Sequence, residues 1–271
     1  MNLFQAVILG LVQGLTEFLP VSSSGHLVLF EEFLGLGASN LRFEVALHLA
    51  TLLAVCFAFR RRIGKLIKAV FTGRIRRVRG EWQFSDDNLR LALMLILATI
   101  PAAVIGILFD DLIEQAFNNP VAVSLALLAT GAILFGTGKV AKRQEKISWK
   151  HSLIIGFSQA LAILPGISRS GTTISAGIYS GVDQEKAAEF SFLLSIPVIL
   201  GAGLLEFKDV LKTGLPPGEL EAIILGGLAA ALSGYLAINI LLKIIRNSKL
   251  QYFAYYCWAA GLISLAWLLL K

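Results

Sequence analysis

Apolar segments long enough to cross a lipid bilayer constrain the fold of this chain more than any other feature. Six of them cover residues 43–59, 89–109, 120–138, 187–206, 219–242 and 251–270. A helix of about 20 apolar residues crosses the roughly 30 Å hydrocarbon core of a membrane. Of the 271 residues, 56% are hydrophobic and only 15% are charged, which is far more apolar than an ordinary soluble domain. We therefore expect an all-α polytopic membrane protein with six transmembrane helices.

Two further apolar regions, 3–36 and 151–182, do not fit the spanning pattern. Each is interrupted near its middle by a proline followed by serines and glycine. A half-helix of about 13 residues extends only about 20 Å, which is too short to cross. Irregular backbone at membrane depth is tolerated only where it is buried in protein or lines a wet cavity. We therefore predict that each region folds as a re-entrant helical hairpin.

The two hairpins are related by an internal repeat with an offset near 146 residues. QGLTEFLPVSSSGH in the first aligns with SQALAILPGISRSG in the second. The aligned residues are Gly10, Gln13, Leu15, Pro20, Ser22, Ser24 and Gly25 with Gly156, Gln159, Leu161, Pro165, Ser168, Ser170 and Gly171. A hairpin plus three crossings in each half inverts the second half relative to the first. We expect one membrane domain, 1–271, with inverted halves of about 1–138 and 151–271.

Basic residues predict the orientation. Nine of the 24 lysines and arginines lie in 60–79, and 139–150 and 243–249 are also basic, whereas 110–119 contains none. The positive-inside rule places the basic loops in the cytoplasm and both termini on the outer side, and explains the net charge of +6 better than nucleic-acid binding does. The N-terminus lacks a secretory signal pattern, so we expect it to be retained. The two cysteines, Cys56 and Cys257, have no metal-site spacing and should be buried free thiols.

Polar residues of the first hairpin suggest chemistry. Gln13 and Glu17 are four residues apart, so they share a helix face, and Glu17 precedes the break at Pro20 by three residues. The half-helix after each break presents free N–H groups and a positive dipole end, which suits an anion. The serines of these turns are Ser22, Ser23, Ser24, Ser168 and Ser170, and each could cap a helix or bind phosphate oxygens.

Arg169 distinguishes the second hairpin, because Ser23 occupies the equivalent position in the first. A guanidinium at membrane depth needs an anion, and a phosphate or pyrophosphate matches its geometry. The alternative is a structural ion pair with Glu17. His26, beside the first turn, could transfer protons near neutral pH.

Other ionisable residues have weaker signals. Glu44 and His48, four residues apart, either pack between helices through hydrogen bonds or line the cavity. Glu189 is near the repeat equivalent of Glu44 and could support the second hairpin. His151, next to a lysine, is expected at the membrane interface.

Together these groups suit phosphoryl transfer on a lipid pyrophosphate: donors for developing charge, a hydroxyl, acid–base groups and oxygens for a divalent cation. The sequence has no Walker loop, H-E-x-x-H or G-x-S-x-G motif. A lipid-phosphate transporter or flippase is the alternative, because inverted repeats with broken helices are also a transporter architecture. An anion channel would need a continuous polar stripe through the spans, and none is seen.

At these motifs the chain resembles the BacA/UppP family of undecaprenyl-pyrophosphate phosphatases. QGLTEFLPVSSSGH is similar to the glutamate-rich motif of that family and PGISRSGTT to its serine–arginine motif, and FEVALHLATLLAV and AAEFSFLLSIPV also match. The resemblance implies hydrolysis of undecaprenyl pyrophosphate to the monophosphate, which recycles the lipid carrier for peptidoglycan synthesis. It also implies a place in the bacterial inner membrane, bacitracin resistance when abundant, and a divalent cation, Mg²⁺ or Ca²⁺.

The resemblance also implies roles for particular residues. It makes Glu17, Ser23, His26 and Arg169 catalytic, and makes Glu17 the metal ligand. It assigns substrate contacts to Gln13, Ser22, Ser24, Gly25, Ser168, Ser170, Gly171 and Thr173. Gln13 departs from the glutamate that many members have, so the cation would be held by Glu17 with substrate phosphates and water. Whether Ser23 attacks or positions water stays open, as does a homodimer; the expected partners are the polyprenyl pyrophosphate and membrane lipids, not nucleic acid.

Overall fold

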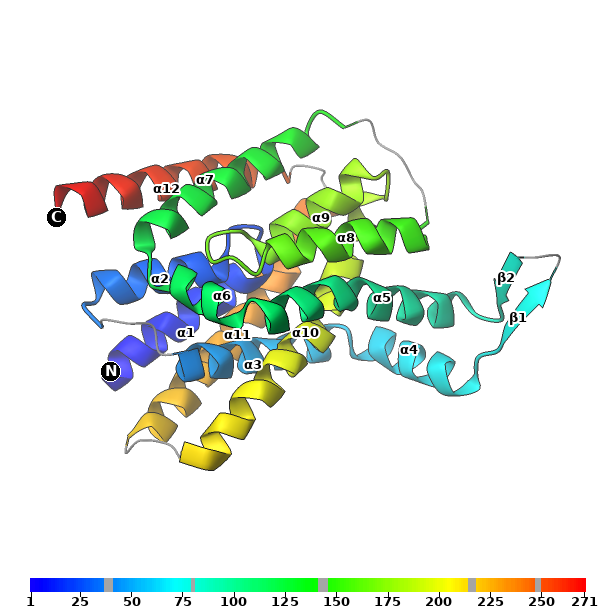
Figure 1. Cartoon of the computed structure of the whole chain (residues 1–271), viewed down its shortest axis with the longest axis horizontal. Helices are drawn as coiled ribbons and strands as arrows, with labels where there is room; N and C mark the ends of the chain where they lie inside the picture. The colour runs from blue at the N-terminus through cyan, green and yellow to red at the C-terminus, as the bar shows by residue number, and fades with distance from the viewer. Residues whose placement is uncertain (37–40, 79–80, 141–145, 214–217, 247–249) are drawn as a thin grey trace.

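A computed structural model describes residues 1–36, 41–78, 81–140, 146–213, 218–246 and 250–271 (Figure 1). Its helices are α1 Leu3–Phe18, α2 Ser23–Phe33, α3 Leu41–Ala58, α4 Arg60–Thr72, α5 Asp87–Leu108, α6 Asp110–Phe117, α7 Pro120–Thr137, α8 Trp149–Leu161, α9 Arg169–Tyr179, α10 Gln184–Thr213, α11 Glu219–Arg246 and α12 Tyr252–Leu270. Two short antiparallel strands, β1 Ile75–Val78 and β2 Glu81–Phe84, complete the secondary structure that is described.

The predicted spanning segments coincide with the helices α3, α5, α7, α10, α11 and α12. Five helices are long and apolar enough to cross a membrane, and a sixth crossing is obtained if α3 and α4 are counted as one broken span. The axis bends by 84° between those two helices, where three consecutive arginines begin α4. A multi-span helical membrane protein is therefore confirmed.

The expectation that the charged connections are plain loops was wrong. The segment 60–88 contains α4 and the β1–β2 hairpin, and 110–119 contains the short helix α6. Helix α4 forms because its apolar residues recur at helical spacing: Leu66 and Ala69 face the protein and are buried, while Ile67 and Phe71 lie on a neighbouring exposed face. The hairpin adds a small β element to the predicted all-α fold.

Both regions that were predicted to be broken contain two short helices separated by a turn. The first break lies between Phe18 and Ser23 and the second between Leu161 and Arg169. Ser22 Oγ accepts from the Gly25 amide at 3.3 Å and Ser168 Oγ from the Gly171 amide at 3.0 Å, so these two serines cap α2 and α9 as predicted.

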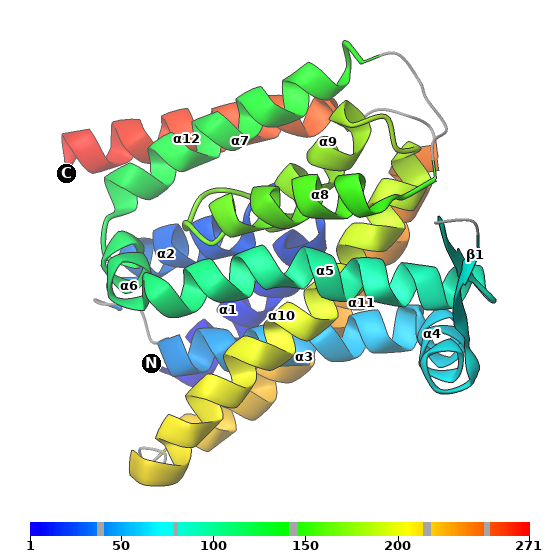
Figure 2. The same cartoon turned by 45° about the vertical axis from the view of Figure 1, so that its right-hand side comes forward.

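The two broken pairs start from opposite ends of the molecule. Figure 2 shows both chain termini and α6 at one end, and α4 with β1 at the other; α1 runs inward from the first end and α8 from the second. Helix α1 packs on α11 while α8 packs on α5, and α7 packs on α12. Glycine allows the close approaches, since a Cβ on Gly10 would overlap the Gly226 carbonyl and one on Gly156 would lie 2.6 Å from the Ala98 carbonyl oxygen.

Buried apolar residues form three clusters, and one of them includes the inner end of α1. Phe18, Ile174, Phe192 and Ile238 belong to one apolar cluster that joins α1, α9, α10 and α11. The rings of Phe18 and Phe192 meet edge to face with centroids 5.9 Å apart. This packing fixes Phe18 at the end of α1. It therefore also fixes the position of Glu17, the residue before Phe18.

Candidate active site

The carboxylate of Glu17 is the centre of a buried polar cluster. Its Oε2 accepts from Ser23 Oγ at 2.5 Å and from Gln13 Nε2 at 3.0 Å, and its Oε1 lies 2.5 Å from Arg169 Nη2. The Glu17 side chain is only 4% exposed. These residues come from α1, α2 and α9, so the structure brings together groups that the sequence places in two separate hairpins.

Arg169 spans from the first hairpin to α10. Besides its ion pair with Glu17, it donates from Nη1 to the Ser191 carbonyl oxygen at 3.4 Å, and its side chain remains 16% exposed. The ion pair that was the alternative interpretation of Arg169 is therefore present. A guanidinium has five donors, so this pairing leaves N–H groups for a second anion.

His48 of α3 is the fifth member of what we call the Glu17 cluster: Gln13, Glu17, Ser23, His48 and Arg169. Its Nε2 lies 3.4 Å from Glu17 Oε2, and its Nδ1 lies 2.8 Å from the carbonyl oxygen of Glu44. A carbonyl can only accept, so Nδ1 carries a hydrogen. The ring therefore turns Nε2 towards the Glu17 carboxylate.

The four-residue spacing of Glu44 and His48 placed both on one face of the helix but did not show whether they pack between helices or line the cavity. His48 bonds the backbone of Glu44 and turns its other nitrogen towards Glu17, so of the two interpretations the structure favours the one in which His48 joins the site. Its side chain is 25% exposed, which leaves a route for proton exchange.

The second hairpin is held by its hydroxyl groups. Ser170 Oγ donates to the Leu19 carbonyl at 3.0 Å, Thr173 Oγ1 lies 2.6 Å from Ser191 Oγ, and the Ser168 amide donates to Thr130 Oγ1 at 3.0 Å. These three predicted substrate contacts therefore bond protein atoms in this structure.

The tips of the two hairpins touch each other. A Cβ on Gly25 would lie 2.9 Å from the Gly166 Cα, and one on Gly171 would lie 3.3 Å from the Pro20 Cβ. Gly166 also needs glycine for its backbone, because its φ is +90°. Close contact at the tips is what brings the N-terminus of α9, and with it Arg169, to the end of α1.

His26 lies one turn after Ser23 but faces another direction. Its Nδ1 donates to the Ser22 carbonyl at 2.7 Å, and its Nε2 lies 2.8 Å from the hydroxyl of Tyr256, whose ring stacks on the imidazole at 5.6 Å. Among the described residues, His26 makes no hydrogen bond to the Glu17 cluster. The predicted grouping of His26 with Glu17 is not formed here. Sequence reasoning missed Tyr256, because nothing in an apolar last span marks one tyrosine.

Ser22 and Ser24, also predicted to contact substrate, lie beside this histidine. Their hydroxyl oxygens are 3.4 Å apart, and Ser22 adopts a left-handed backbone with φ of 68°. A non-glycine residue in that conformation is uncommon and is typical of a constrained functional turn. The strained turn places Ser23 at the start of α2, within reach of Glu17.

Two expectations away from the site need correction. Glu189 pairs with Arg62 of α4 at 2.6 Å instead of supporting the second hairpin. Both cysteines are free, but only Cys257 is fully buried. His151, expected at the membrane interface, is buried within the protein at the start of α8, which it caps together with Ser148.

The cluster offers limited support for a divalent cation. Among the residues that the structure describes, no three histidine, cysteine or acidic side chains gather as a metal site. The available oxygens are those of Glu17 and the Oε1 of Gln13, which is buried and has no partner within the described chain. Oxygen ligands of this kind fit Mg²⁺ or Ca²⁺, with one negative charge from the protein.

Comparison with known proteins agrees with this geometry. Residues 6–263 match the family model described as bacitracin resistance protein BacA. A protein of Halothermothrix orenii named undecaprenyl-diphosphatase is 42% identical over 97% of both chains. Proteins of the same name from Methanobrevibacter smithii, 46% identical over 97% of this chain and 96% of the relative, and from Rubrobacter xylanophilus, 43% identical over the whole of both, are also similar. The chain belongs to the BacA family.

Proposed function

We propose that this protein is an undecaprenyl-diphosphatase, an integral membrane phosphatase that releases inorganic phosphate from the lipid diphosphate. The observation that carries the proposal is the 2.5 Å contact between the Ser23 hydroxyl and the Glu17 carboxylate, next to a guanidinium. A nucleophile, a base and an anion-binding group are thus adjacent. The relatives named undecaprenyl-diphosphatase support the substrate.

In the proposed reaction Ser23 is the nucleophile. Its proton passes to Glu17 as Oγ bonds to the terminal phosphorus, and the bond from that phosphorus to the bridging oxygen breaks, releasing the lipid monophosphate. Water then attacks the phosphorus of the phosphoserine, and the bond from that phosphorus to Ser23 Oγ breaks. Glu17 returns its proton to Oγ, takes one proton from the water and releases it to solvent, which restores the ionised carboxylate as inorganic phosphate leaves. Arg169 stabilises the equatorial oxygens in both steps, and the N-terminus of α9 adds its free amides.

Three further residues support this chemistry. His48 Nε2, 3.4 Å from Glu17 Oε2, would take over the proton that the carboxylate accepts. Glu17 and the unpartnered Oε1 of Gln13 would hold Mg²⁺ or Ca²⁺ with phosphate oxygens and water, and the cation would neutralise charge on the pyrophosphate. His26 would be the second acid–base group once its Nε2, which lies 2.8 Å from the Tyr256 hydroxyl in this structure, meets a phosphate oxygen in place of that hydroxyl.

For the architecture we propose six crossings and two re-entrant hairpins arranged as an inverted repeat. The packing of α1 on α11 and of α8 on α5 supports it, because these pairs exchange under a twofold relation between the halves. We propose that the basic end faces the cytoplasm and that both termini are outside. A cysteine introduced at residue 75 should then react with a membrane-impermeant thiol reagent only after the membrane is permeabilised. Labelling of that cysteine in intact cells would show that the orientation is the opposite of the one proposed.

The test is phosphate release from polyprenyl diphosphate by the purified protein in detergent, for wild type, Ser23→Ala and the control Ser85→Ala, at an exposed serine after β2. We expect Ser23→Ala to lose at least about a hundredfold in rate, whereas Ser85→Ala keeps most activity. A folded wild type that releases no phosphate with any divalent cation would overturn the enzyme assignment and favour a lipid-phosphate transporter.

A further inference from the structure

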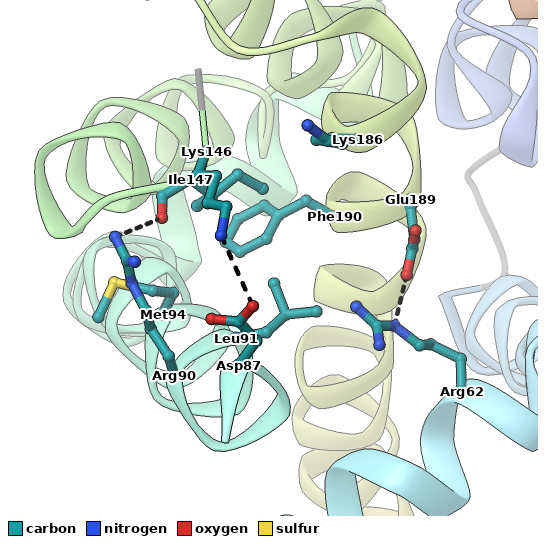
Figure 3. A pocket seen from close by; sticks show the side chains of 10 residues that line it. All are labelled: Arg62, Asp87, Arg90, Leu91, Met94, Lys146, Ile147, Lys186, Glu189 and Phe190. Carbon is teal, nitrogen blue, oxygen red and sulfur yellow. Dashed lines mark hydrogen bonds and ion pairs between the residues drawn. The ribbon is translucent and has the colours of Figure 1, made fainter. Parts of the chain in front are cut away.

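A second concentration of cationic side chains lies away from the Glu17 cluster, in a pocket of about 260 Å³ at the basic end of the molecule (Figure 3). The four cations that line it come from four segments: Arg62 of α4, Arg90 of α5, Lys146 before α8, and Lys186 of α10. Among the described residues that line the pocket, Asp87 and Glu189 are the acidic ones, so this part of the lining carries a surplus of two positive charges.

The two arginines are held in place by the protein. Arg62 donates from Nε to Glu189 at 2.6 Å, and Arg90 donates from Nη2 to the Ile147 carbonyl at 3.1 Å (Figure 3). Arg62 also donates from Nη1 to the Asn88 side chain at 2.5 Å. Each guanidinium keeps further N–H donors beyond these bonds. The two guanidinium groups are therefore already ordered in the free protein. A ligand that binds them causes little further loss of side-chain conformational entropy.

The lysines are less occupied. Lys146 lies 3.7 Å from Asp87, and both side chains are more than two-thirds exposed, so this contact is weak. The Lys186 ammonium makes no hydrogen bond or ion pair with any described residue. Donors of this kind, added to two guanidinium groups, are suited to the several oxygens of a phosphate.

The rest of the lining is apolar: Leu91, Met94, Ile147 and Phe190. The residues from α5 and α10 lie near the N-terminal ends of those apolar helices, and the end of a membrane span is expected close to the lipid headgroups. Helix α4 next to the pocket exposes Ile67, Val70 and Phe71 beside its basic face. An exposed apolar face that flanks a basic one is typical of a helix lying at a membrane surface.

We propose that this pocket binds the phosphate of an anionic membrane lipid, with the lipid chains against its apolar residues. Free inorganic phosphate offers the same oxygens but would leave the apolar lining uncovered. A basic pocket between spans at the membrane surface is a general mode of lipid headgroup binding. The site is separate from the Glu17 cluster, so it stands whether or not the proposed hydrolysis is correct.

The experiment titrates purified full-length protein in neutral detergent with phosphatidylglycerol, and counts the first lipid bound by native mass spectrometry. The pocket variant is Lys146→Gln/Lys186→Gln. The matched control is Lys65→Gln/Lys68→Gln, which removes the same charge from the exposed face of α4. We expect at least about tenfold weaker phosphatidylglycerol binding for the pocket variant and a change within about twofold for the control. Lys146→Arg/Lys186→Arg should keep the affinity.

Two further ligands separate the sources of phosphate. Phosphatidylcholine with the same chains should bind at least about tenfold more weakly than phosphatidylglycerol, and inorganic phosphate should fail to displace the bound lipid at equal concentration. Equal losses in the pocket and control variants would overturn the site. Displacement by inorganic phosphate as efficient as by the lipid would overturn its assignment to a lipid.

Discussion

Glu17 and Arg169 form an ion pair across 152 residues of sequence, with Nη2 of the arginine 2.5 Å from Oε1 of the carboxylate. Each hairpin supplies one partner, and both lie at a helix end that faces the other tip. The candidate site therefore forms only when the two hairpins pack together, because Glu17 comes from the first and Arg169 from the second.

Replacing Arg169 by lysine tests whether the guanidinium does more than balance Glu17. Lysine keeps the charge but loses the planar fork that can hold Glu17 and a phosphate together. We expect kcat/KM for lipid diphosphate to fall at least about a hundredfold. The control is Arg74→Lys, at an exposed site next to β1. Unchanged hydrolysis in Arg169→Lys would reduce the role of this residue to charge compensation.

Replacing His48 by glutamine tests the proton at the centre of the cluster. The amide of glutamine can still donate to Glu17 but cannot exchange protons with the carboxylate. We expect kcat to fall at least about tenfold in His48→Gln, with little change in KM. Unchanged kcat in His48→Gln would contradict the role of His48.

Changing Gln13 to glutamate would add the second carboxylate that many relatives are expected to have. Gln13 Nε2 already lies 3.0 Å from Glu17 Oε2, so a carboxylate there would face Glu17 and favour a shared divalent cation. We expect the Mg²⁺ concentration for half-maximal activity to fall about tenfold in Gln13→Glu. Gln13→Met, which removes the unpartnered oxygen, should raise it. Identical Mg²⁺ titrations in all three proteins, after chelator treatment, would remove both residues from the proposed cation site.

Much of this arrangement was predictable, because hydropathy and the two proline breaks depend on local sequence alone. Apolar helices lie over the six segments predicted to span, and the breaks at Pro20 and Pro165 and the caps at Ser22 and Ser168 appear where expected. What could not be predicted depends on packing between distant helices. The rotation of α3 against α1 determines that His48 meets Glu17.

Packing between distant helices also explains why the predicted partners of His26 and Glu189 differ from those in the structure. Tyr256 of α12 draws His26 away from the cluster, although the two are separated by 230 residues. Glu189 was assigned by repeat position, but the fold places the basic helix α4 against it, and an arginine outcompetes any weaker polar partner. The aligned serines Ser22 and Ser168 both cap a helix, whereas Glu189 and Glu44 have different partners, so the sequence alignment did not predict the side-chain contacts.

The glycine contacts behind α1 allow a final prediction, on stability. A Cβ on Gly10 would overlap the Gly226 carbonyl, and both helix backbones would have to separate to admit it. We expect Gly10→Ala to destabilise the protein by about 1–3 kcal/mol, the usual cost of overpacking. The matched control is Gly201→Ala on α10, where a Cβ meets nothing within 4 Å and helix propensity should add up to about 1 kcal/mol. Thermal unfolding in one detergent, followed by circular dichroism, compares the two variants. An unfolding midpoint for Gly10→Ala at or above that of the wild type would show that α1 and α11 lie further apart than in the structure. The position of Glu17, which depends on this packing, would then also differ from the one described.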